Sequence, residues 1–392
     1  MRKLSVLVIH NQYQQPGGED AVVRAEAGML RRAGHHVMEF TRRNAVIAQY
    51  KPWQKASLCV STTWNQNAYA EIRKVIAEER PDVAHCHNLL PLVSPAAYYA
   101  CKSEGVRVVQ TLHNYRLLCP SGALYAGGRI CDDCTRSLAS GIKRGCYRDS
   151  RLQTATLAMM LGAHRLLGTW RRTVDAYVAL NQFARDYFVA AGLPAEKIHV
   201  KPNFLLDDPA PRCGTADYAL FVGRLAAEKG VLEMLSAWQQ LPHIPLFVAG
   251  DGPMRERVQH LLRQPSTAHI KLLGQVSADD VTAQMKNARF LVFPSRWYEP
   301  FPMTLLQAAA CGLPAVAACI GGVPEVVVEG KTGLLFDPHN LEGLVAKADW
   351  AWCHPVEMAA MGSAARRLYQ QKYTAESNYE LLMNVYQAAL SN

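Results

Sequence analysis

Two cations follow the end of a predicted strand in the segment FVGRLAAEKG, and their types and spacing suit a diphosphate ligand. Phe221 and Val222 end the strand, Gly223 permits a turn, and Arg224 and Lys229 follow, five residues apart. A guanidinium binds phosphate oxygens through a fork of donors, and an ammonium adds a point charge, so the two together can hold two phosphates. Surface charge in contact with solvent is the alternative interpretation.

Glycine-containing turns recur before predicted helices in the same half of the chain. VAGDGP contains Gly250, and GGVPE contains Gly321 and Gly322. Free N–H groups at a helix start can bind a phosphate oxygen. Strand-to-helix turns commonly carry glycine, so a purely structural turn explains either segment equally well.

The segment EPFPMTLLQAAACGLP predicts a helix that starts near Pro302 or Met303 and stops at Cys311 and Gly312. Glu299 precedes this helix. We expect the start of the helix to face a binding cleft, because the strand and helix ends that carry such motifs meet there in doubly wound proteins.

Four cysteines, Cys119, Cys131, Cys134 and Cys146, form a central CxxC with a further cysteine on each side, separated from it by eleven residues. The glycines and aspartates between them predict a loop that lacks an apolar core, which a structural zinc ion could hold together. Unpaired cysteines or a disulfide are the alternative. The eleven cysteines of the chain are otherwise expected to be buried apolar residues in a reducing compartment.

The elements that must position these residues alternate between short apolar runs and helix-like segments, starting with residues 4–9, 20–33 and 36–40. Continuous apolar runs of this length suit the strands of a parallel sheet covered on both faces. A chain of 392 residues exceeds one ordinary core, and residues 203–214, rich in Pro and Asp, resemble a linker. The sequence therefore predicts an α/β fold with two doubly wound, Rossmann-like lobes that face each other across a cleft.

We expect the N-terminal lobe to span residues 1–204, with the cysteine-containing insert near 119–146. The C-terminal lobe should span 205–375. The last helix, 376–392, is expected to cross back to the N-terminal lobe.

The net charge of +9 is concentrated in residues 136–172, where eight Lys or Arg stand against one acid, Asp149. Residues 151–172 have apolar positions at roughly helical spacing with basic ends, which predicts either a peripheral contact with an anionic membrane or an interior helix with solvated ends. No run approaches the roughly 20 apolar residues of a membrane span, and the first apolar run lacks a signal-peptide cleavage site. We expect a cytoplasmic protein, at the inner face of the cell membrane if the peripheral contact exists, and no nucleic-acid partner, because no basic-aromatic recognition module is visible.

The order of GGED, HN, TLHNYR, FVGRLAAEKG, VAGDGP, EPFPMTLLQAAACGLP and GGVPE resembles family four of the retaining GT-B glycosyltransferases, also called glycosyl transferases group 1. The resemblance covers nearly the whole chain. It implies that the N-terminal lobe binds the acceptor and that the C-terminal lobe binds the nucleotide sugar. It implies metal-independent transfer of a sugar from a nucleotide diphosphate donor, with retention of the anomeric configuration and no catalytic cofactor. A run similar to His85-Cys86-His87-Asn88 is common in that family, so we discount the two histidines as metal ligands.

The resemblance assigns roles to four groups of residues. Arg224 and Lys229 resemble the diphosphate pair, Gly17 and Gly18 the N-terminal glycine loop beside the phosphates, Glu299 the contact to donor sugar hydroxyls, and His113 a histidine near the donor sugar. The other positions placed at the donor are Gly223, Gly250, Phe301, Met303, Thr304, Gln307 and Gly322.

Two residues depart from the family pattern. Gln307 stands where a glutamate binds the ribose diol, and an uncharged amide oxygen makes a weaker hydrogen bond than a carboxylate. Pro302 stands where a glycine is usual and has no N–H to offer a phosphate.

These features predict a retaining glycosyltransferase that moves a hexose-type sugar from a nucleotide diphosphate sugar to a glycan, lipid-linked or other acceptor, in surface polysaccharide or glycoconjugate synthesis. A sugar-nucleotide epimerase is one alternative, although the motif order argues against it. A non-catalytic sugar-nucleotide-binding protein is the other, with Gln307 and Pro302 as its only indications.

Overall fold

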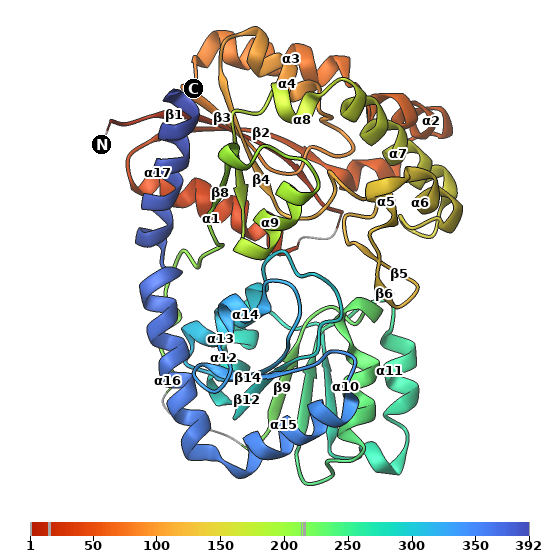
Figure 1. Ribbon diagram of the computed structural model, residues 1–392, viewed down its shortest axis with the longest axis vertical. Helices are drawn as coiled ribbons and strands as arrows, with labels where there is room; N and C mark the ends of the chain where they lie inside the picture. The colour runs from red at the N-terminus through yellow and green to blue at the C-terminus, as the bar shows by residue number, and fades with distance from the viewer. Residues whose placement is uncertain (1, 15–16, 213, 215–216, 392) are drawn as a thin grey trace. The chain divides into compact units, whose positions relative to one another are not determined.

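The computed structural model describes residues 2–14, 17–212, 214 and 217–391, and the chain divides into two compact units (Figure 1). Unit 1 comprises Met1–Ala126, Cys131–Leu206 and Ala375–Asn392, and unit 2 comprises Gly127–Ile130 and Asp207–Thr374. Residues 203–212 of the predicted linker form no helix or strand, and residue 213 lies outside the described residues. The chain thus changes units on either side of Gly127–Ile130, after Leu206 and again before Ala375.

Unit 1 is built on a parallel six-stranded sheet in the order β2-β1-β3-β4-β7-β8. Its strands are β1 (Ser5–Gln12), β2 (His36–Arg43), β3 (Val83–Cys86), β4 (Arg107–Leu112), β7 (Ala176–Ala179) and β8 (Ile198–Val200). Every residue of β3 and β7 is buried, as expected for parallel strands covered on both faces. The six strands expected for this half of the chain, the first two at 4–9 and 36–40, are therefore found, with ends that move by at most three residues.

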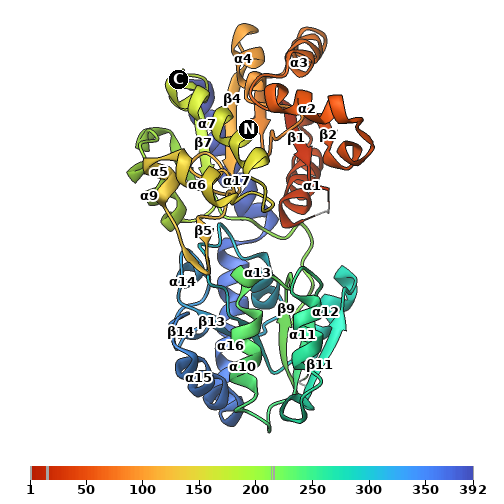
Figure 2. The same ribbon diagram turned by 90° about the vertical axis from the view of Figure 1, so that its right-hand side faces the viewer.

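The helices of unit 1 flank this sheet on both faces (Figures 1 and 2). They are α1 (Gly18–Arg32), α2 (Pro52–Ser61), α3 (Gln66–Glu79), α4 (Ala96–Ser103), α5 (Asp133–Arg136), α6 (Leu138–Arg144), α7 (Arg151–Leu166), α8 (Thr169–Arg172), α9 (Gln182–Ala190) and α17 (Ala375–Ser391). Asn65 and Asn181 cap α3 and α9 by accepting backbone N–H bonds from Ala68 and Ala184. The last helix, α17, packs against β4 and β7 and so completes the core of unit 1.

Two local expectations for unit 1 are wrong. Residues 119–146 are not a coreless loop, because they form α5 and α6 and bury Leu124 and Cys134. Residues 151–172 are not one helix, because Gly168 adopts φ +65°, a left-handed conformation that ends a helix, and separates α7 from α8.

Unit 2 repeats the architecture with the strand order β11-β10-β9-β12-β13-β14. Its strands are β9 (Ala219–Val222), β10 (Leu246–Ala249), β11 (Ile270–Gly274), β12 (Phe290–Phe293), β13 (Ala315–Ala318) and β14 (Gly333–Phe336). All pairings between these strands are parallel. The predicted parallel α/β class is confirmed in both units.

The helices of unit 2 are α10 (Val231–Trp238), α11 (Arg255–Leu261), α12 (Ala278–Asn287), α13 (Met303–Ala310), α14 (Val323–Val326), α15 (Leu341–Cys353) and α16 (Pro355–Lys372). Helix α10 packs against α15, and α13 packs against α16. Gly312 and Gly362 allow the latter contact, since a Cβ on Gly362 would lie 2.2 Å from the carbonyl oxygen of Gly312. A short hairpin, β5 (Tyr125–Ala126) and β6 (Arg129–Ile130), completes the strands.

Candidate active site

The strand order of unit 2 reverses between β9 and β12. In an open parallel sheet this reversal opens a crevice at the carboxyl ends of the two strands, because their following segments leave toward opposite faces. The segment after β9 carries Arg224 and Lys229, and the segment after β12 carries Glu299. The topology therefore brings residues 70 positions apart to the same edge of the sheet.

Lys229 and Glu299 form the centre of this edge. The Lys229 Nζ donates to Glu299 Oε1 in a short ion pair, and Ser295 Oγ donates to the same carboxylate oxygen at 3.0 Å. Glu299 is buried, while Lys229 keeps part of its side chain exposed and lies 5.3 Å from the centre of the Trp297 ring. A buried carboxylate is thus held in place beside a cation that solvent or a ligand can still reach.

Arg224 behaves differently from Lys229. Its guanidinium is exposed and pairs with Glu228, four residues further along the chain. Both predicted phosphate-binding cations therefore follow the same strand, but they contact different carboxylates.

Two glycines of this edge are required by close approach of the backbone. A Cβ on Gly250 would lie 1.8 Å from the carbonyl oxygen of Gly223, and one on Gly230 would lie 2.0 Å from that of Pro294. Gly250 therefore holds the turn after β10 against the turn after β9, and Gly230 brings the segments after β9 and β12 together. This packing is a structural reason for Gly230 and Gly250, whatever ligand they meet, whereas a Cβ on Gly223 would make only an ordinary contact, at 3.4 Å from the Phe221 ring.

Helix α13 starts at Met303, within the predicted range, with Pro302 as its N-terminal cap residue. Phe301 is buried, and Met303, Thr304 and Gln307 are half-buried on the first two turns. Gly321 adopts φ +54°, and a Cβ there would lie 3.2 Å from Cα of Tyr298. The glycine pair that ends at Gly322 therefore packs beside the backbone that carries Glu299, ahead of the single turn of α14.

Unit 1 has its own reversal of strand order, between β1 and β3. Gly17 and Gly18 follow β1 and open α1, as expected for a glycine loop at a helix start. The Gly17 N–H already donates to Asp20 Oδ2 at 2.9 Å, and Asp20 Oδ1 lies 2.8 Å from His10 Nε2. Burial would raise the pKa of Asp20, but the hydrogen bonds from His10 and Gly17 lower it overall. In this arrangement the Gly17 N–H makes a hydrogen bond within its own loop and helix start.

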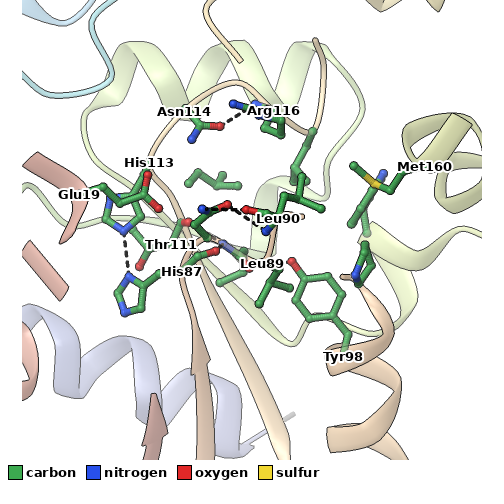
Figure 3. A pocket seen from close by; sticks show the side chains of 16 residues that line it. Glu19, His87, Leu89, Leu90, Tyr98, Thr111, His113, Asn114, Arg116 and Met160 are labelled. Carbon is green, nitrogen blue, oxygen red and sulfur yellow. Dashed lines mark hydrogen bonds between the residues drawn. The ribbon is translucent and has the colours of Figure 1, made fainter. Parts of the chain in front are cut away.

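His113 follows β4 and lines a small pocket of unit 1 with Glu19, His87, Asn114 and Arg116 (Figure 3). Glu19 Oε2 accepts a hydrogen bond from the Tyr13 hydroxyl at 2.8 Å, and Glu19 Oε1 is buried without a hydrogen-bond partner. Burial raises the pKa of Glu19 to about 7 and lowers the pKa of His113 to about 3. The pocket thus holds a neutral histidine beside a carboxyl group that titrates near neutral pH.

Sequence reasoning missed Glu19, Glu26 and Lys201 as members of this region. Glu19 belongs to the GGED motif, so its position one residue into a helix was a signal that could have been used. Glu26 and Lys201 had no such signal, because their pairing at 2.8 Å joins α1 to the end of β8 across 175 residues.

The four cysteines gather in the insert, but their sulfur atoms do not form a closed cage. Cys119 and Cys134 are hydrogen-bonded to each other, whereas Cys131 contacts the Arg144 guanidinium at 3.1 Å. Across the described residues, the only three His, Cys, Asp or Glu side chains with ligand atoms within 4.8 Å of one another are Glu26, His85 and His87. The hydrogen bond from Cys134 lowers the pKa of the Cys119 thiol.

Two family models match the chain, one for each unit. The model described as Glycosyltransferase Family 4 matches residues 16–205, and the model described as Glycosyl transferases group 1 matches residues 209–368. Together they leave only the termini and a three-residue junction unmatched. The chain belongs to glycosyltransferase family 4 of the GT-B fold. It is therefore a transferase that uses a nucleotide-sugar donor.

Several relatives support the assignment of the chain to this glycosyltransferase family. An uncharacterized glycosyltransferase of Methanocaldococcus jannaschii is 34% identical over 34% of this chain and 38% of the relative, and a second from the same organism is 24% identical over 84% and 81%. A GDP-mannose-dependent phosphatidylinositol monomannoside mannosyltransferase of Mycolicibacterium smegmatis is 28% identical over 49% of this chain and 56% of that enzyme. The match to this enzyme of named activity thus spans about half of each protein.

Solved structures support the fold. The sucrose-phosphate synthase of Thermosynechococcus elongatus aligns with a TM-score of 0.73 at 17% identity, covering 99% of this chain and 100% of that one. HepE of Anabaena, in complex with UDP-glucose, aligns with a TM-score of 0.71 at 17% identity, covering 98% and 100%. Within the described part of the glycosyltransferase, none of the helices has the length and apolar character needed to span a membrane.

Proposed function

We propose that this glycosyltransferase moves a hexose-type sugar from a nucleotide diphosphate donor to an acceptor hydroxyl, with retention of configuration and without a metal ion. Unit 2 would bind the donor nucleotide, and unit 1 would bind the acceptor. The observation that carries the proposal is the Lys229–Glu299 pair at the strand-order reversal of unit 2, because it combines a reachable cation with a buried, oriented carboxylate.

Departure of the diphosphate is the difficult step of such a transfer. Negative charge grows on the leaving phosphate as the bond between the anomeric carbon and the phosphate oxygen breaks. Fixed cations lower the barrier most where that charge develops. Lys229 and Arg224 would supply these charges and would replace the metal ion that many other transferases use. A diphosphate would compete with Glu299 and Glu228 for the two cations.

Glu299 would then bind hydroxyl groups of the donor sugar. A carboxylate accepts hydrogen bonds and donates none, so it selects for hydroxyls at a fixed position. Ser295 orients the carboxylate by donating to Oε1 and would hold it when Lys229 turns toward the diphosphate.

The deciding experiment compares Arg224→Ala, Lys229→Ala and Glu299→Ala. Each cation variant should lose about one to two orders of magnitude in transfer efficiency, since a charge-assisted hydrogen bond contributes about 1.5 to 3 kcal/mol. Both should also weaken binding of the free nucleoside diphosphate, whereas Glu299→Ala should leave that binding nearly unchanged. Lys347→Ala is the matched control, because Lys347 pairs with Glu329 away from this edge.

The roles are wrong if the three folded variants transfer sugar like the wild type, or if Glu299→Ala alone loses nucleotide binding. The donor itself would be found by screening nucleotide sugars for thermal stabilisation, since ligands that bind only the folded state raise its apparent stability. Transfer to an acceptor would exclude the non-catalytic alternative, and unchanged sugar configuration at other carbons would exclude an epimerase.

We also propose that unit 1 contacts an anionic membrane and so reaches a lipid-linked acceptor of surface polysaccharide or glycoconjugate synthesis. Exposed apolar side chains recur every seven residues on α7, at Leu152, Met159 and Leu166, and on α2, at Trp53 and Val60. Seven residues are two helical turns, so each set shares one face. Helix α2 packs against α7, and the apolar residues have exposed cations beside them in sequence, Lys51, Lys55 and Arg151. Apolar side chains flanked by cations suit the headgroup region of anionic lipids.

The cysteine insert carries a separate structural proposal, one zinc ion bound by Cys119, Cys131, Cys134 and Cys146. The lowered pKa of Cys119 and its hydrogen bond with Cys134 support two of the four ligands, because zinc binds thiolates. Cys131 would have to leave Arg144 to take part. Metal analysis of protein purified without chelator should find about one zinc per chain, and its absence would refute the proposal.

A further inference from the structure

A row of three buried or half-buried side chains leads from α1 to the pocket of unit 1. Glu26 lies on α1, His87 follows β3, and His113 follows β4. His87 Nδ1 lies 2.8 Å from His113 Nε2, a hydrogen bond drawn in Figure 3. On its other side, His87 Nε2 lies 3.6 Å from Glu26 Oε1.

The bond between the two imidazoles allows two proton arrangements. Either His113 donates its Nε2–H to His87 Nδ1, or His87 donates its Nδ1–H to His113 Nε2. In the second arrangement a neutral His87 would point the lone pair of Nε2 at the Glu26 carboxylate, and two acceptors would repel each other. The first arrangement instead points the His87 Nε2–H at the carboxylate.

The charge of Glu26 decides between them, and its neighbours keep it charged. Lys201 Nζ donates to Glu26 Oε2 at 2.8 Å, and His85 Nδ1 lies 3.0 Å from Glu26 Oε1. Burial alone would raise the pKa of Glu26, but Lys201 and His85 lower it well below its usual value. Burial also lowers the pKa of His87 and of His113, so both rings are neutral.

A metal ion is a poor alternative occupant of this cluster. Lys201 already places one positive charge on the Glu26 carboxylate, and a divalent cation beside it would be repelled. Both nitrogens of His85 are also engaged, Nδ1 with the Tyr386 hydroxyl and Nε2 with the Thr111 hydroxyl, each at 2.8 Å.

We propose that Glu26 and His87 are positioning residues that fix His113 as the Nε2–H tautomer, so that its Nδ1 accepts a hydrogen bond from a substrate hydroxyl. The substrate class, a hydroxyl-bearing sugar, rests on the proposed function. The tautomer itself does not depend on it. A neutral His113 of this tautomer has no second N–H, so it cannot donate to a phosphate oxygen.

The direct test is the protonation pattern of the histidine nitrogens. Long-range ¹H–¹⁵N spectra of ¹⁵N-histidine protein, assigned with His87→Gln and His113→Gln, should show a proton on Nε2 of both rings. A proton on Nδ1 of His113 would overturn the proposal. In Glu26→Gln the carboxylate charge is gone, and the preference for Nε2–H at His113 should weaken.

Kinetics then test whether His87 acts through His113. His87→Ala should lower kcat/KM about tenfold, the effect of losing one oriented hydrogen bond. His87→Gln should recover part of this loss, because its amide oxygen can accept the His113 Nε2–H. In a His113→Ala background, His87→Ala should add no further loss, and an additive loss would contradict the positioning role.

His35→Ala is the matched control, because His35 is also a buried histidine of unit 1 but lies outside this row, with its Nε2 2.9 Å from the Tyr379 hydroxyl of α17. It should change stability but neither the His113 tautomer nor transfer. Failure of the proposed function would appear as a wild type without transfer activity, whereas failure of this inference would appear as the wrong tautomer in the wild-type protein.

Discussion

Each unit contains a lysine paired with a glutamate near the carboxyl ends of its strands, and the two pairs differ in burial. In unit 1, Lys201 and Glu26 leave 1% and 3% of their side chains exposed. In unit 2, Lys229 and Glu299 leave 23% and 6% exposed. In the first pair, Lys201 also donates a hydrogen bond to Asn378 of α17 at 3.0 Å. In the second pair, solvent or a ligand can reach Lys229.

The comparison shows how one topology produces two kinds of site. A fully buried ion pair that is broken leaves a charge without a partner, so it holds a structure in place. A partly exposed pair can exchange one partner for a ligand, so it can bind. The predictions below separate these two roles.

The largest effect is expected at the buried pair. Lys201→Met should lower the free energy of unfolding by about 3 to 5 kcal/mol, because it leaves the Glu26 carboxylate without its cation. The pKa of Glu26 is lowered in the folded protein, so the contribution of the pair is present at neutral pH and is lost as the pH falls below the ordinary value of 4.5. Urea unfolding at pH 8 and at acidic pH should show a loss that shrinks in acid. A loss at pH 8 no larger than that of Lys347→Met, which breaks an exposed pair, would contradict the structural role.

Glu19 offers the opposite case, a buried acid whose charge is disfavoured. Its pKa is raised from 4.5 to about 7 by burial, with Tyr13, His10, Asp20 and Arg116 as the charged or polar neighbours. Wild-type stability should therefore fall as the pH rises from about 4.5 through 7, by about 3 kcal/mol. Glu19→Gln should remove this fall. Unfolding curves of the two proteins at pH 5 and pH 8 test it, with the exposed Glu256→Gln as control, and parallel pH dependences would refute it.

The apolar face of α7 gives an intermediate effect. Leu166 is 91% exposed, and Leu166→Ser should weaken binding to anionic vesicles by about 2 kcal/mol, roughly thirtyfold, if that side chain enters the lipid. Vesicle sedimentation measures the partition. Val356→Ser, on an exposed apolar residue of unit 2, should change nothing, and equal recovery of the wild type from neutral and anionic vesicles would exclude the contact.

The smallest stability effect is expected at the open pair. Lys229→Ala should lower the free energy of unfolding by about 1 kcal/mol, because solvent reaches the lysine of this pair, which is 23% exposed, and Ser295 still donates to the buried Glu299 carboxylate. The same substitution should lower transfer by one to two orders of magnitude, as argued above. A loss of stability as large as that of Lys201→Met would erase the distinction between the two pairs.

The sequence by itself was sufficient for the strands, for the class of fold and for the strand ends that carry the motifs. Apolar runs such as FLVF and AVAA must be buried on both faces, and only a covered parallel sheet does this, so β12 and β13 were predictable to the residue. Gly250 and Gly312 marked turns, because a glycine beside a predicted strand or helix is itself a local turn signal. The roles of Arg224, Lys229, Glu299 and His113 remain predictions from the family resemblance.

Only the tertiary structure decided which side chains meet. The reversal of strand order brings Glu299 to Lys229, and the packing of α1, β3 and β4 brings Glu26, His87 and His113 into one row. Helix α17, the last in the chain, places Asn378 beside Lys201 and Tyr386 beside His85, the two residues that contact Glu26. These contacts join residues up to 301 positions apart in the sequence. They depend on the order of the strands and on the direction in which each side chain points, and local residue patterns predict neither of these.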